Sequence, residues 1–390
     1  MRILILSFYF SPDIGPGALR AKTLCDELNK NYKNLNIDIV TTMPNRYYTY
    51  RVAALSLEKK GPILVKRIDL PKHKSGMLDQ TKAFIVYARE VLKFTRGKKW
   101  DLVFATSSRL MTASLAAYVS RRSKSKLYLD IRDLFTETME DLLSKKLLRL
   151  IMPILKLIEK RTFRSADKVN VVSQGFLPHF KKVVPKIRPT VYTNGIDEFF
   201  LEHNYEVKVK KETTLILYAG NIGKGQGLAN IVPKAALGLG KKFIFRIIGD
   251  GSERRQLDDA IKEHNITNVE IFDPLPRSEL IKHYQEAEIL FLHLNSYNAF
   301  KKVIPSKVFE YAATGKPILA GVSGYAAYFL SQQVSGTSVF NPNDFQSLKV
   351  ALNHILEDEK HYSRKSFIST YSRKHIMKKM ANDIYKLVEL

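Results

Sequence analysis

The chain has 390 residues, 45% of them hydrophobic, which is enough to bury two cores of ordinary domain size. Its net charge of +25 indicates a partner that is nucleic acid, an anionic membrane face or a phosphorylated substrate. Nucleic acid is the weakest of these, because the basic residues are spread over many helices and show no zinc-finger or RNA-binding signature. A single cysteine, Cys25, excludes an intramolecular disulfide and a multi-cysteine metal site, as expected in a reducing cytoplasm.

Strand-like and helical segments alternate along the first half of the chain. Strands are predicted at residues 3–10, 36–42, 101–107 and 126–131, with helices at 18–29 and 83–94. The first run follows Met1 and Arg2 directly, so we expect a buried strand rather than a signal peptide. No run of about twenty apolar residues predicts a membrane-spanning helix. The alternation predicts a parallel sheet with helices on both faces.

The same pattern restarts after a charged, aperiodic connection at residues 197–211. Further strands are predicted at residues 214–220, 242–251, 268–275, 288–294 and 316–322. The sequence therefore predicts an α/β protein with two Rossmann-like, doubly wound domains at residues 1–198 and 199–365. A helical segment at residues 366–390 is expected to return towards the first domain.

Glycine turns follow the predicted strands at three places. They lie at Gly15-Pro16-Gly17, at residues 220–227 and at Gly249-Asp250-Gly251. In open parallel sheets, ligands bind beyond the carboxyl ends of the strands, where such turns and helix N-termini collect. One glycine turn is weak evidence because any tight connection can use it, but three at equivalent ends predict a ligand site.

The segment IPSKVFEYAATGKP, residues 304–317, is predicted to be a loop that turns into a short helix. Pro305 suits the first turn, Ser306 can cap it, and Lys307 adds positive charge, so the helix start is expected to hold an anion. Glu310 places a carboxylate behind it. The alternative, an ordinary buried helix with a solvated glutamate, stays open on this segment alone.

Together these segments resemble family 4 glycosyltransferases of the GT-B fold over nearly the whole chain. The resemblance rests on FYFSPDIGPGALRAKTLCDEL, LDIRDLFTET, ADKVNVVSQGF, YTNGIDEFF, YAGNIGKGQGL, IIGDGSERRQL and PSKVFEYAATGKPILA. GNIGKGQGL and PSKVFEY are similar to the branch that builds bacterial capsule and O-antigen polysaccharides from N-acetylated amino sugars. The family implies two domains facing a cleft, a nucleotide-diphosphate sugar bound mainly by the second, an acceptor bound mainly by the first, and transfer with retention of configuration.

The resemblance also implies roles for individual residues. In such a transfer the diphosphate leaves while positive charge builds on the sugar, so the negative charge of the leaving diphosphate must be stabilised. We assign this role to Lys224, Lys307 and the backbone N–H groups at Ser306 and Val308. Glu310 corresponds to the acid that holds the ribose hydroxyls, and backbone groups at Leu275 and Pro276 are expected to contact the base. The other expected donor-binding residues are Gly15, Gly17, Gly220, Asn221, Gln226, Gly249 and Lys302.

The chain departs from the family pattern at two positions. A second acid is frequent eight positions before Glu310, where this chain has Lys302. An arginine is frequent where Asn221 stands, so Lys302 or Arg277 is expected to compensate for the incomplete basic pair. Both departures are compatible with a donor that is an amino or deoxy sugar rather than a plain hexose.

Candidate acceptor-side residues lie in the first domain. Arg132 and Asp133 leave the strand at 126–131, where the family has polar groups facing the acceptor, and they are expected to be catalytic and acceptor-binding. The alternative is an Arg–Asp ion pair that fixes a loop. His73 and Lys74 are further candidates for an acceptor phosphate, with a solvated loop as the preferred explanation.

A strongly apolar run at residues 147–163, LLRLIMPILKLIEKRTF, is punctuated and flanked by basic residues. These are Lys145, Lys146, Arg149, Lys156, Lys160, Arg161 and Arg164. The pattern is compatible with an interfacial helix on anionic lipid. A core helix with a solvated basic face explains it at least as well.

We therefore predict a retaining, metal-independent glycosyltransferase that moves a sugar from UDP to a glycan acceptor carried on a polyprenyl diphosphate. It is expected in the cytoplasm, peripheral to the inner membrane face, with an anionic membrane surface as an open partner. No metal or other cofactor is predicted, since His179, His264 and His354 lack metal-ligand spacing. Two alternatives remain, a nucleotide-binding regulator or scaffold without activity and a nucleotide-sugar epimerase.

Overall fold

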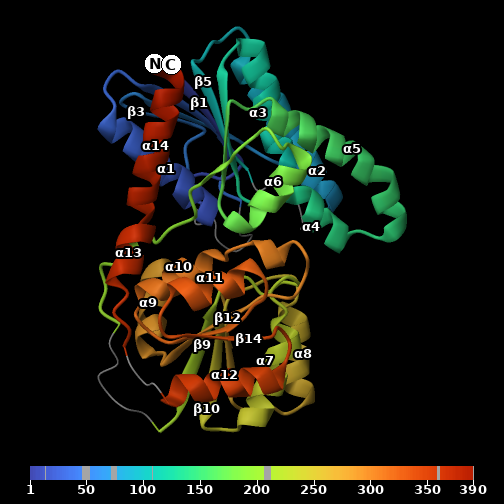
Figure 1. Ribbon diagram of the computed structural model, residues 1–390, viewed down its shortest axis with the longest axis vertical. Helices are drawn as coiled ribbons and strands as arrows, with labels where there is room; N and C mark the ends of the chain where they lie inside the picture. The colour runs from blue at the N-terminus through green and yellow to red at the C-terminus, as the bar shows by residue number, and fades with distance from the viewer. Residues whose placement is uncertain are drawn as a thin grey trace. The chain divides into compact units, whose positions relative to one another are not determined.

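The structure, a computed structural model, describes residues 1–13, 15–45, 53–71, 77–107, 109–205, 212–357 and 361–389. It divides into two units, one made of Met1–Asn194 and Arg373–Leu390 and the other of Gly195–Ser372. Each unit is built on one largely or wholly parallel sheet with helices on both faces (Figure 1). This confirms the predicted doubly wound α/β class.

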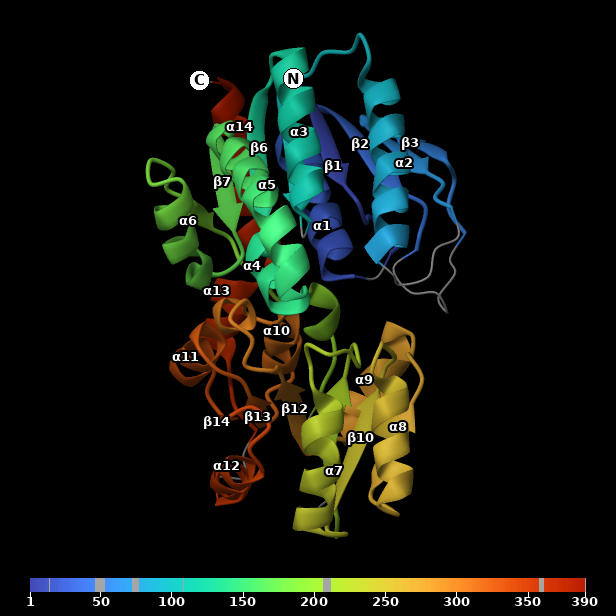
Figure 2. The ribbon, with the colours of Figure 1, turned by 90° about the vertical axis from the view of Figure 1, so that its right-hand side faces the viewer.

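The first sheet has the strand order β3-β4-β2-β1-β5-β6-β7-β8, and only β3 runs antiparallel to its neighbour. Its strands are β1 Arg2–Ser7, β2 Asn36–Thr42, β3 Leu57–Lys60, β4 Ile63–Ile68, β5 Leu102–Ser107, β6 Lys126–Ile131, β7 Lys168–Val171 and β8 Thr190–Val191. Its helices are α1 Pro16–Asn31, α2 Met77–Thr95, α3 Leu110–Ser123, α4 Phe135–Leu142, α5 Lys145–Arg164, η1 Gln174–Phe176, α6 Leu177–Val183 and α14 Arg373–Glu389. Figures 1 and 2 show α1 and α14 on one face and α2, α3 and α5 on the other.

The second sheet has six parallel strands in the order β11-β10-β9-β12-β13-β14. They are β9 Thr214–Ala219, β10 Phe243–Ile248, β11 Val269–Phe272, β12 Ile289–His293, β13 Ile318–Gly321 and β14 Thr337–Phe340. The helices are η2 Glu198–Phe200, α7 Leu228–Leu239, α8 Arg254–Glu263, α9 Arg277–Glu286, η3 Phe300–Lys302, α10 Ser306–Ala313, α11 Tyr325–Gln333, α12 Phe345–Glu357 and α13 Lys365–Tyr371.

The central strands of the second unit, β9, β12 and β13, are buried on both faces. Along β9, Leu215, Leu217 and Ala219 lie in one apolar core, and Ile216 and Tyr218 lie in the other. Side chains alternate across a strand, so helices on both sides of the sheet make nearly every position of these central strands apolar. This explains the unbroken apolar runs in the sequence.

The units divide at slightly different points from the expected boundaries. Ile196 is fully buried in the second core, and its N–H donates to the carbonyl of Tyr371 at 2.7 Å, so the chain enters the second unit at Gly195. Phe367 of α13 is buried in the same core. The helical segment expected at 366–390 is therefore split, and only α14 joins the first unit, where Tyr385 stacks on Tyr32, the C-cap residue of α1, with ring centroids 4.1 Å apart.

A buried histidine ties α4, α5 and α6 together. His179 of α6 contacts Glu137 of α4 through Nδ1 at 2.8 Å and Glu159 of α5 through Nε2 at 3.1 Å. Glu159 also accepts a hydrogen bond from Thr136 at 2.7 Å. Burial opposes protonation of the ring, but the two carboxylates outweigh it and raise the pKa of His179 to about 9. The charged ring therefore holds the three helices together at neutral pH.

We expect this cluster to make the stability of the first unit fall as the pH rises from 6.5 to 9. The pKa of His179 is about 9 when folded and 6.5 ordinarily, so the folded state binds more protons in this range. The contribution, about 3 kcal/mol, is complete below pH 6.5 and lost as the pH passes 9. Urea unfolding followed by the fluorescence of Trp100, the single tryptophan and buried in this unit, measures it.

The matched variant is His179→Gln, which keeps an amide in place of the ring. We expect it to be less stable than the wild type at pH 6.5, and the gap to narrow as the pH approaches 9. The difference in the free energy of unfolding between the two proteins at each pH cancels the titration of every other group. A gap that stays constant over this range would show that the proton on His179 carries none of the stability.

Candidate functional site

The second sheet reverses its strand order between β9 and β12, and the segments that follow these two strands meet. The N–H of Asn295 donates to the carbonyl of Gly225 at 2.9 Å, and its side-chain amide donates to the carbonyl of Lys224 at 2.5 Å. In doubly wound sheets, ligands bind at the carboxyl ends of the strands at such a switch point. The glycine loop at residues 220–227 therefore lies where the sequence predicts a ligand site.

His293, the last residue of β12, forms a hydrogen bond to the backbone of this loop. It is fully buried, its Nδ1 donates to the carbonyl of Gln226 at 2.6 Å, and its Nε2 accepts from the N–H of Asn343 at 3.0 Å. Burial lowers the pKa of His293 to about 4, so the ring is neutral and the two bonds select one tautomer. Sequence reasoning missed this residue. The available signal was a histidine at the end of an otherwise apolar strand.

The glycines at this edge allow two backbone segments to touch. Gly249, at a φ of 151°, follows β10, and a Cβ built on it would overlap the carbonyl oxygen of Gly220. The N–H of Gly220 in turn donates to the carbonyl of Ile248 at 2.9 Å. The two predicted glycine turns of the second unit are therefore in direct contact, which only glycine permits at Gly249.

Asn221 and Gln226 close the loop rather than supply charge. The side-chain amide of Asn221 donates to Oε1 of Gln226 at 2.7 Å, and the N–H of Gly223 reaches the same oxygen at 3.3 Å. The side chain of Lys224, between them, is exposed. The backbone of the loop is therefore held by hydrogen bonds, and it presents one exposed cation.

Glu310 forms an ion pair with Lys307 on α10. Lys307 Nζ lies 2.8 Å from Glu310 Oε2, and Tyr284 donates to the same oxygen at 3.4 Å. A Cβ built on Gly220 would lie 3.3 Å from Cε of Lys307, so the pair stands directly beside the glycine loop. Both side chains are only partly exposed, 22% for Lys307 and 16% for Glu310. The carboxylate is therefore positioned at the predicted site and is not merely solvated.

The start of α10 differs in detail from the prediction. The helix begins at Ser306, with Pro305 as its N-cap residue, and the side chain of Ser306 does not cap it. The N–H of Val308 already donates to the carbonyl of Pro305 at 3.1 Å. The donors at the open end of this helix are therefore the N–H groups of Ser306 and Lys307 rather than that of Val308.

Other predicted donor-side residues lie around this group. Leu275 packs on the core just before α9, and Pro276 is the N-cap residue of that helix. Lys302 ends the short helix η3 before α10. Arg277 was expected to compensate for the arginine that is absent at Asn221. It forms an ion pair with Asp197 at 3.0 Å and lies over the ring of Phe199, 4.5 Å from its centroid. Arg277 therefore has a structural partner already.

The predicted residues of the first unit that the structure describes lie at the start of α1 and at the ends of β5 and β6. Gly15 is the N-cap residue of α1, and a Cβ built on Gly17 would overlap the guanidinium of Arg132, so α1 and the end of β6 touch. Asp133 lies in a small hollow with Ser107 and Arg109 at the end of β5. His73 and Lys74 lie outside the described residues. Arg132 and Asp133 thus stand at the carboxyl edge of the first sheet.

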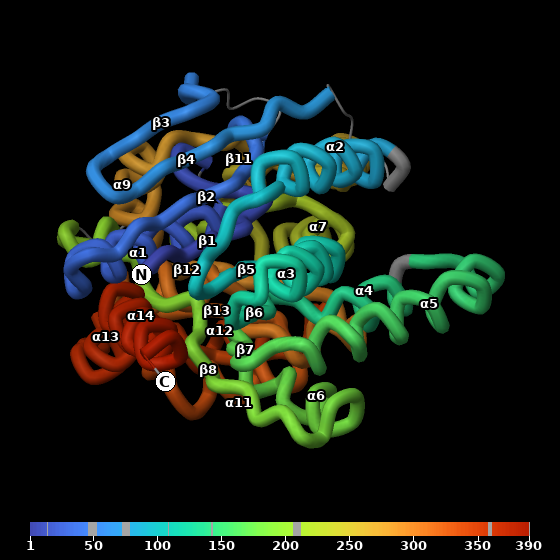
Figure 3. Tube along the Cα trace, turned by 90° about the horizontal axis from the view of Figure 1, so that it is seen from above, coloured from blue at the N-terminus to red at the C-terminus, as the bar shows by residue number. Residues whose placement is uncertain are grey.

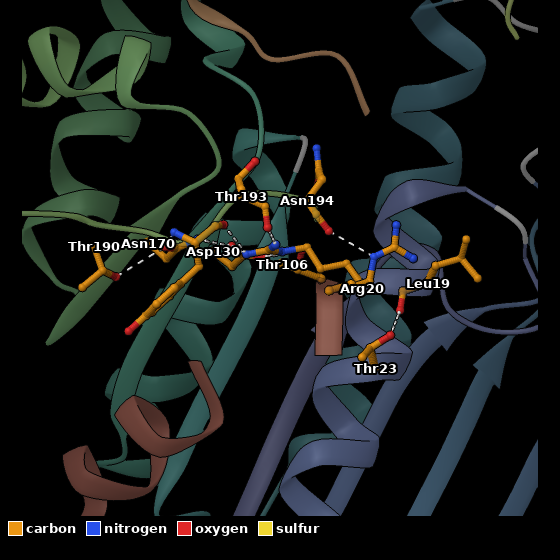
Figure 4. Close-up of polar contacts among 11 residues, drawn as sticks. Leu19, Arg20, Thr23, Thr106, Asp130, Asn170, Thr190, Thr193 and Asn194 are labelled. Carbon is orange, nitrogen blue, oxygen red and sulfur yellow. Dashed lines mark hydrogen bonds and ion pairs between the residues drawn. The ribbon is translucent and has the colours of Figure 1, made fainter. Parts of the chain in front are cut away.

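Sequence reasoning also missed a buried ion pair in the first unit. Arg20 of α1 and Asp130 of β6 are 1% and 0% exposed, and Arg20 Nε lies 2.9 Å from Asp130 Oδ2 (Figure 4). Asn170 and Thr106 donate to the same carboxylate, and Arg20 also donates to the carbonyls of Tyr192, at 2.7 Å, and Thr193. Burial works against ionisation, but Arg20 outweighs it and holds the pKa of Asp130 below its ordinary value.

A comparison with known protein families finds a match over most of the second unit. Residues 202–374 match the family described as glycosyl transferases group 1. The match covers less than half of the chain. All the residues that form the Lys224 loop and the Lys307–Glu310 pair lie inside the matched residues. Within the described residues, no group of three or more His, Cys, Asp or Glu side chains is placed to hold a metal ion, and a metal-independent reaction stays a prediction.

Two curated relatives of the chain are named as glycosyltransferases. WcaI of Escherichia coli, named for colanic acid biosynthesis, is 25% identical over 174 residues, 44% of this chain and 42% of WcaI. This chain therefore matches less than half of the length of WcaI. WbjE of Pseudomonas aeruginosa, named as a glycosyltransferase, is 25% identical over 288 residues, 67% of this chain and 68% of WbjE.

Solved structures give the fold of the whole chain. Sucrose-phosphate synthase from Thermosynechococcus elongatus has a TM-score of 0.76 at 14% identity, covering 99% of both chains. HepE of Anabaena, in complex with UDP and glucose, has a TM-score of 0.68 at 16% identity, again covering 99% of both. At these identities the likeness shows the fold alone, and it confirms the predicted GT-B class.

The sequence predicts that Glu310 holds the ribose of a nucleotide sugar, so we expect Glu310→Ala to weaken binding of that ligand by about tenfold to a hundredfold through the loss of charge-assisted hydrogen bonds. The fold should survive, since the side chain fills no core space. Calorimetry with the nucleotide measures the affinity, and Glu279→Ala, an exposed glutamate on α9, is the control. An unchanged affinity for Glu310→Ala would remove Glu310 from the site.

Proposed function

We propose that this protein is a retaining glycosyltransferase that moves a sugar from UDP to a glycan acceptor in the synthesis of a bacterial surface polysaccharide. The proposed donor is an N-acetylated amino sugar or a deoxy-amino sugar, and the proposed acceptor is carried on a polyprenyl diphosphate. This places the protein at the cytoplasmic face of the membrane. The names of WcaI and WbjE and the UDP and glucose bound to HepE support this class of reaction.

The observation that carries the proposal is that the Lys307–Glu310 pair lies beside the glycine loop that contains Lys224, at the switch point of the second sheet. Lys307 stands beside Gly220 and pairs with Glu310 at 2.8 Å, and Lys224 projects from the loop that His293 and Asn295 hold. Cations beside open backbone N–H groups suit a diphosphate. A carboxylate one turn along suits a diol, because it can accept two hydrogen bonds.

The chemistry follows from the charges that change during transfer. Breaking the bond from the sugar to the diphosphate leaves negative charge on the phosphate and positive charge on the ring. We assign Lys224 and Lys307, together with the N-terminus of α10, to stabilising the leaving diphosphate. Glu310 would then exchange Lys307 for the ribose hydroxyls. Because lysines supply the positive charge, the proposed reaction needs no metal, and turnover should persist after chelation.

On the acceptor side we propose Arg132 and Asp133. They extend from the carboxyl end of β6, and Arg132 lies against the start of α1 at Gly17. A guanidinium suits an acceptor phosphate, and a carboxylate suits a sugar hydroxyl. Lys302, where a second acid is frequent in the family, is proposed to contact the donor sugar.

The test is a binding screen of UDP, GDP and ADP and of their sugar conjugates by thermal shift at fixed salt, because a ligand of the folded state raises its melting temperature. Selective stabilisation by UDP and its conjugates, followed by sugar transfer to a polyprenyl-linked acceptor, is the expected result. Binding without turnover on any acceptor would indicate a regulator or scaffold. Conversion of the donor without an acceptor would indicate an epimerase. Stabilisation by none of the nucleotides would overturn the proposal.

A further inference from the structure

Helix α5 carries an exposed apolar stripe. Leu150, Ile154 and Leu157 are 73%, 60% and 48% exposed. Spacings of four and three residues place them on one face of the helix, and Pro153 between them is exposed as well. Large apolar side chains grouped in this way mark an interaction surface rather than an ordinary helix exterior.

The exposed part of the helix around this stripe is strongly basic. The exposed cations of α5 are Lys145, Lys146, Arg149, Lys156, Lys160, Arg161 and Arg164. The helix has one acidic residue, Glu159, which is 1% exposed and points inward to His179. Lys156 is paired with Glu140 of α4 at 2.7 Å. The outward face of α5 is therefore an apolar stripe bordered by positive charge.

The opposite face of α5 fixes this orientation. Met152, Glu159, Thr162 and Phe163 are buried, and Phe163 stacks on Phe180 of α6 with ring centroids 4.6 Å apart. All of them lie in the second two thirds of the helix, so its first two turns bury no side chain. Figures 1 and 3 show α4 and α5 projecting from the edge of the first unit.

We propose that this face of α5 binds an anionic lipid bilayer, with the helix lying in the plane of the interface. Leu150, Ile154 and Leu157 enter the boundary between headgroups and acyl chains, and the bordering lysines and arginines contact anionic headgroups. Among the described residues, no helix is both long and apolar enough to cross a membrane. The inference extends the proposed placement at the membrane face and rests on it.

Charge favours lipid over the other candidate occupants of this face. A second copy of α5 would bring two sets of cations together, which opposes self-association. A nucleic acid would leave the apolar stripe facing a polar backbone. An anionic bilayer satisfies both parts of the surface, since it offers negative charge at the headgroups and an apolar layer beneath them.

The test is co-sedimentation of the full-length protein with vesicles, without nucleotide or acceptor, so that its outcome is independent of transferase activity. We expect binding to phosphatidylcholine vesicles with about 30% phosphatidylglycerol, and at least about tenfold weaker binding to pure phosphatidylcholine. The triple variant Leu150→Ser, Ile154→Ser, Leu157→Ser keeps every charge and should lose about tenfold or more. The variant Lys145→Gln, Lys146→Gln, Arg149→Gln should lose a similar factor.

The control is Ile85→Ser, Leu237→Ser, Val350→Ser, which removes three apolar side chains of similar exposure, 59%, 55% and 57%, from other helices. It should bind like the wild type, and circular dichroism should show that all variants are folded. If the triple variant at Leu150, Ile154 and Leu157 bound anionic vesicles as tightly as the wild type, net charge alone would explain the binding and the proposal would be overturned. Failure of the wild type to bind anionic vesicles, or a dimer in sedimentation velocity that this triple variant abolishes, would also overturn it.

Discussion

Replacing Asp130 with asparagine is expected to destabilise the first unit by about 3–5 kcal/mol, because it leaves the buried guanidinium of Arg20 without its counter-charge. Arg20 and Asp130 are 1% and 0% exposed and bond through two pairs of atoms, at 2.9 and 3.0 Å. The same carboxylate organises Thr106 and Asn170, so the loss reaches three strands. Urea unfolding followed by Trp100 fluorescence reports on this unit alone.

The control is an exposed pair on the same helix. Lys22 and Asp26 are 2.5 Å apart, with side chains 46% and 51% exposed, and Asp26→Asn should change the stability by less than about 1 kcal/mol. Equal effects of the two substitutions would show that burial gives the Arg20–Asp130 pair no special weight. Nucleotide binding by the second unit should be the same in both variants, which separates loss of stability from loss of the site.

Lys224→Ala is expected to lower kcat by about a hundredfold to a thousandfold, because a cation that stabilises charge developing on a leaving group acts mainly in the transition state. The backbone of the loop should keep its shape, since His293 and Asn295 bond to carbonyl groups rather than to the lysine side chain. Donor affinity should fall much less than kcat. Steady-state rates and calorimetry with the same UDP-sugar measure the two effects.

Lys234→Ala is the control for Lys224, because Lys234 is an exposed lysine on α7, the helix that follows the loop. It should change neither rate nor affinity. Equal losses in kcat/KM and in donor affinity for Lys224→Ala, with kcat unchanged, would make Lys224 a simple binding residue. Together with Glu310→Ala, this comparison separates the group that holds the nucleotide from the group that stabilises its departure.

Local patterns were sufficient to predict most elements. The strand expected at residues 36–42 coincides with β2, and the helix expected at 18–29 lies within α1, Pro16–Asn31. Both depend on the period of the apolar residues, which neighbouring positions carry. The start of α10 was predicted less well. Pro305 and Ser306 are both common at helix starts, and only the backbone geometry shows that Pro305 is the N-cap residue.

The Lys307–Glu310 pair could have been predicted from the sequence, because residues three apart on a helix are neighbours. The contacts that hold the loop were not. His293 reaches Gln226, and Asn295 reaches Lys224, across 67 and 71 positions of the chain. The partner of Arg20 was equally hidden, since Asp130 lies 110 positions away.

The sequence by itself determined that this protein has two doubly wound α/β units, with glycine turns at the carboxyl ends of their strands and a carboxylate on the helix after β12. Apolar period and turn residues are local properties, so one chain suffices to read them. Only the tertiary structure decided that β9 lies beside β12, that α13 and α14 belong to different units, and that α5 turns its apolar stripe outward. Strand order and the direction of a helix face depend on packing between distant segments, which local pattern does not contain.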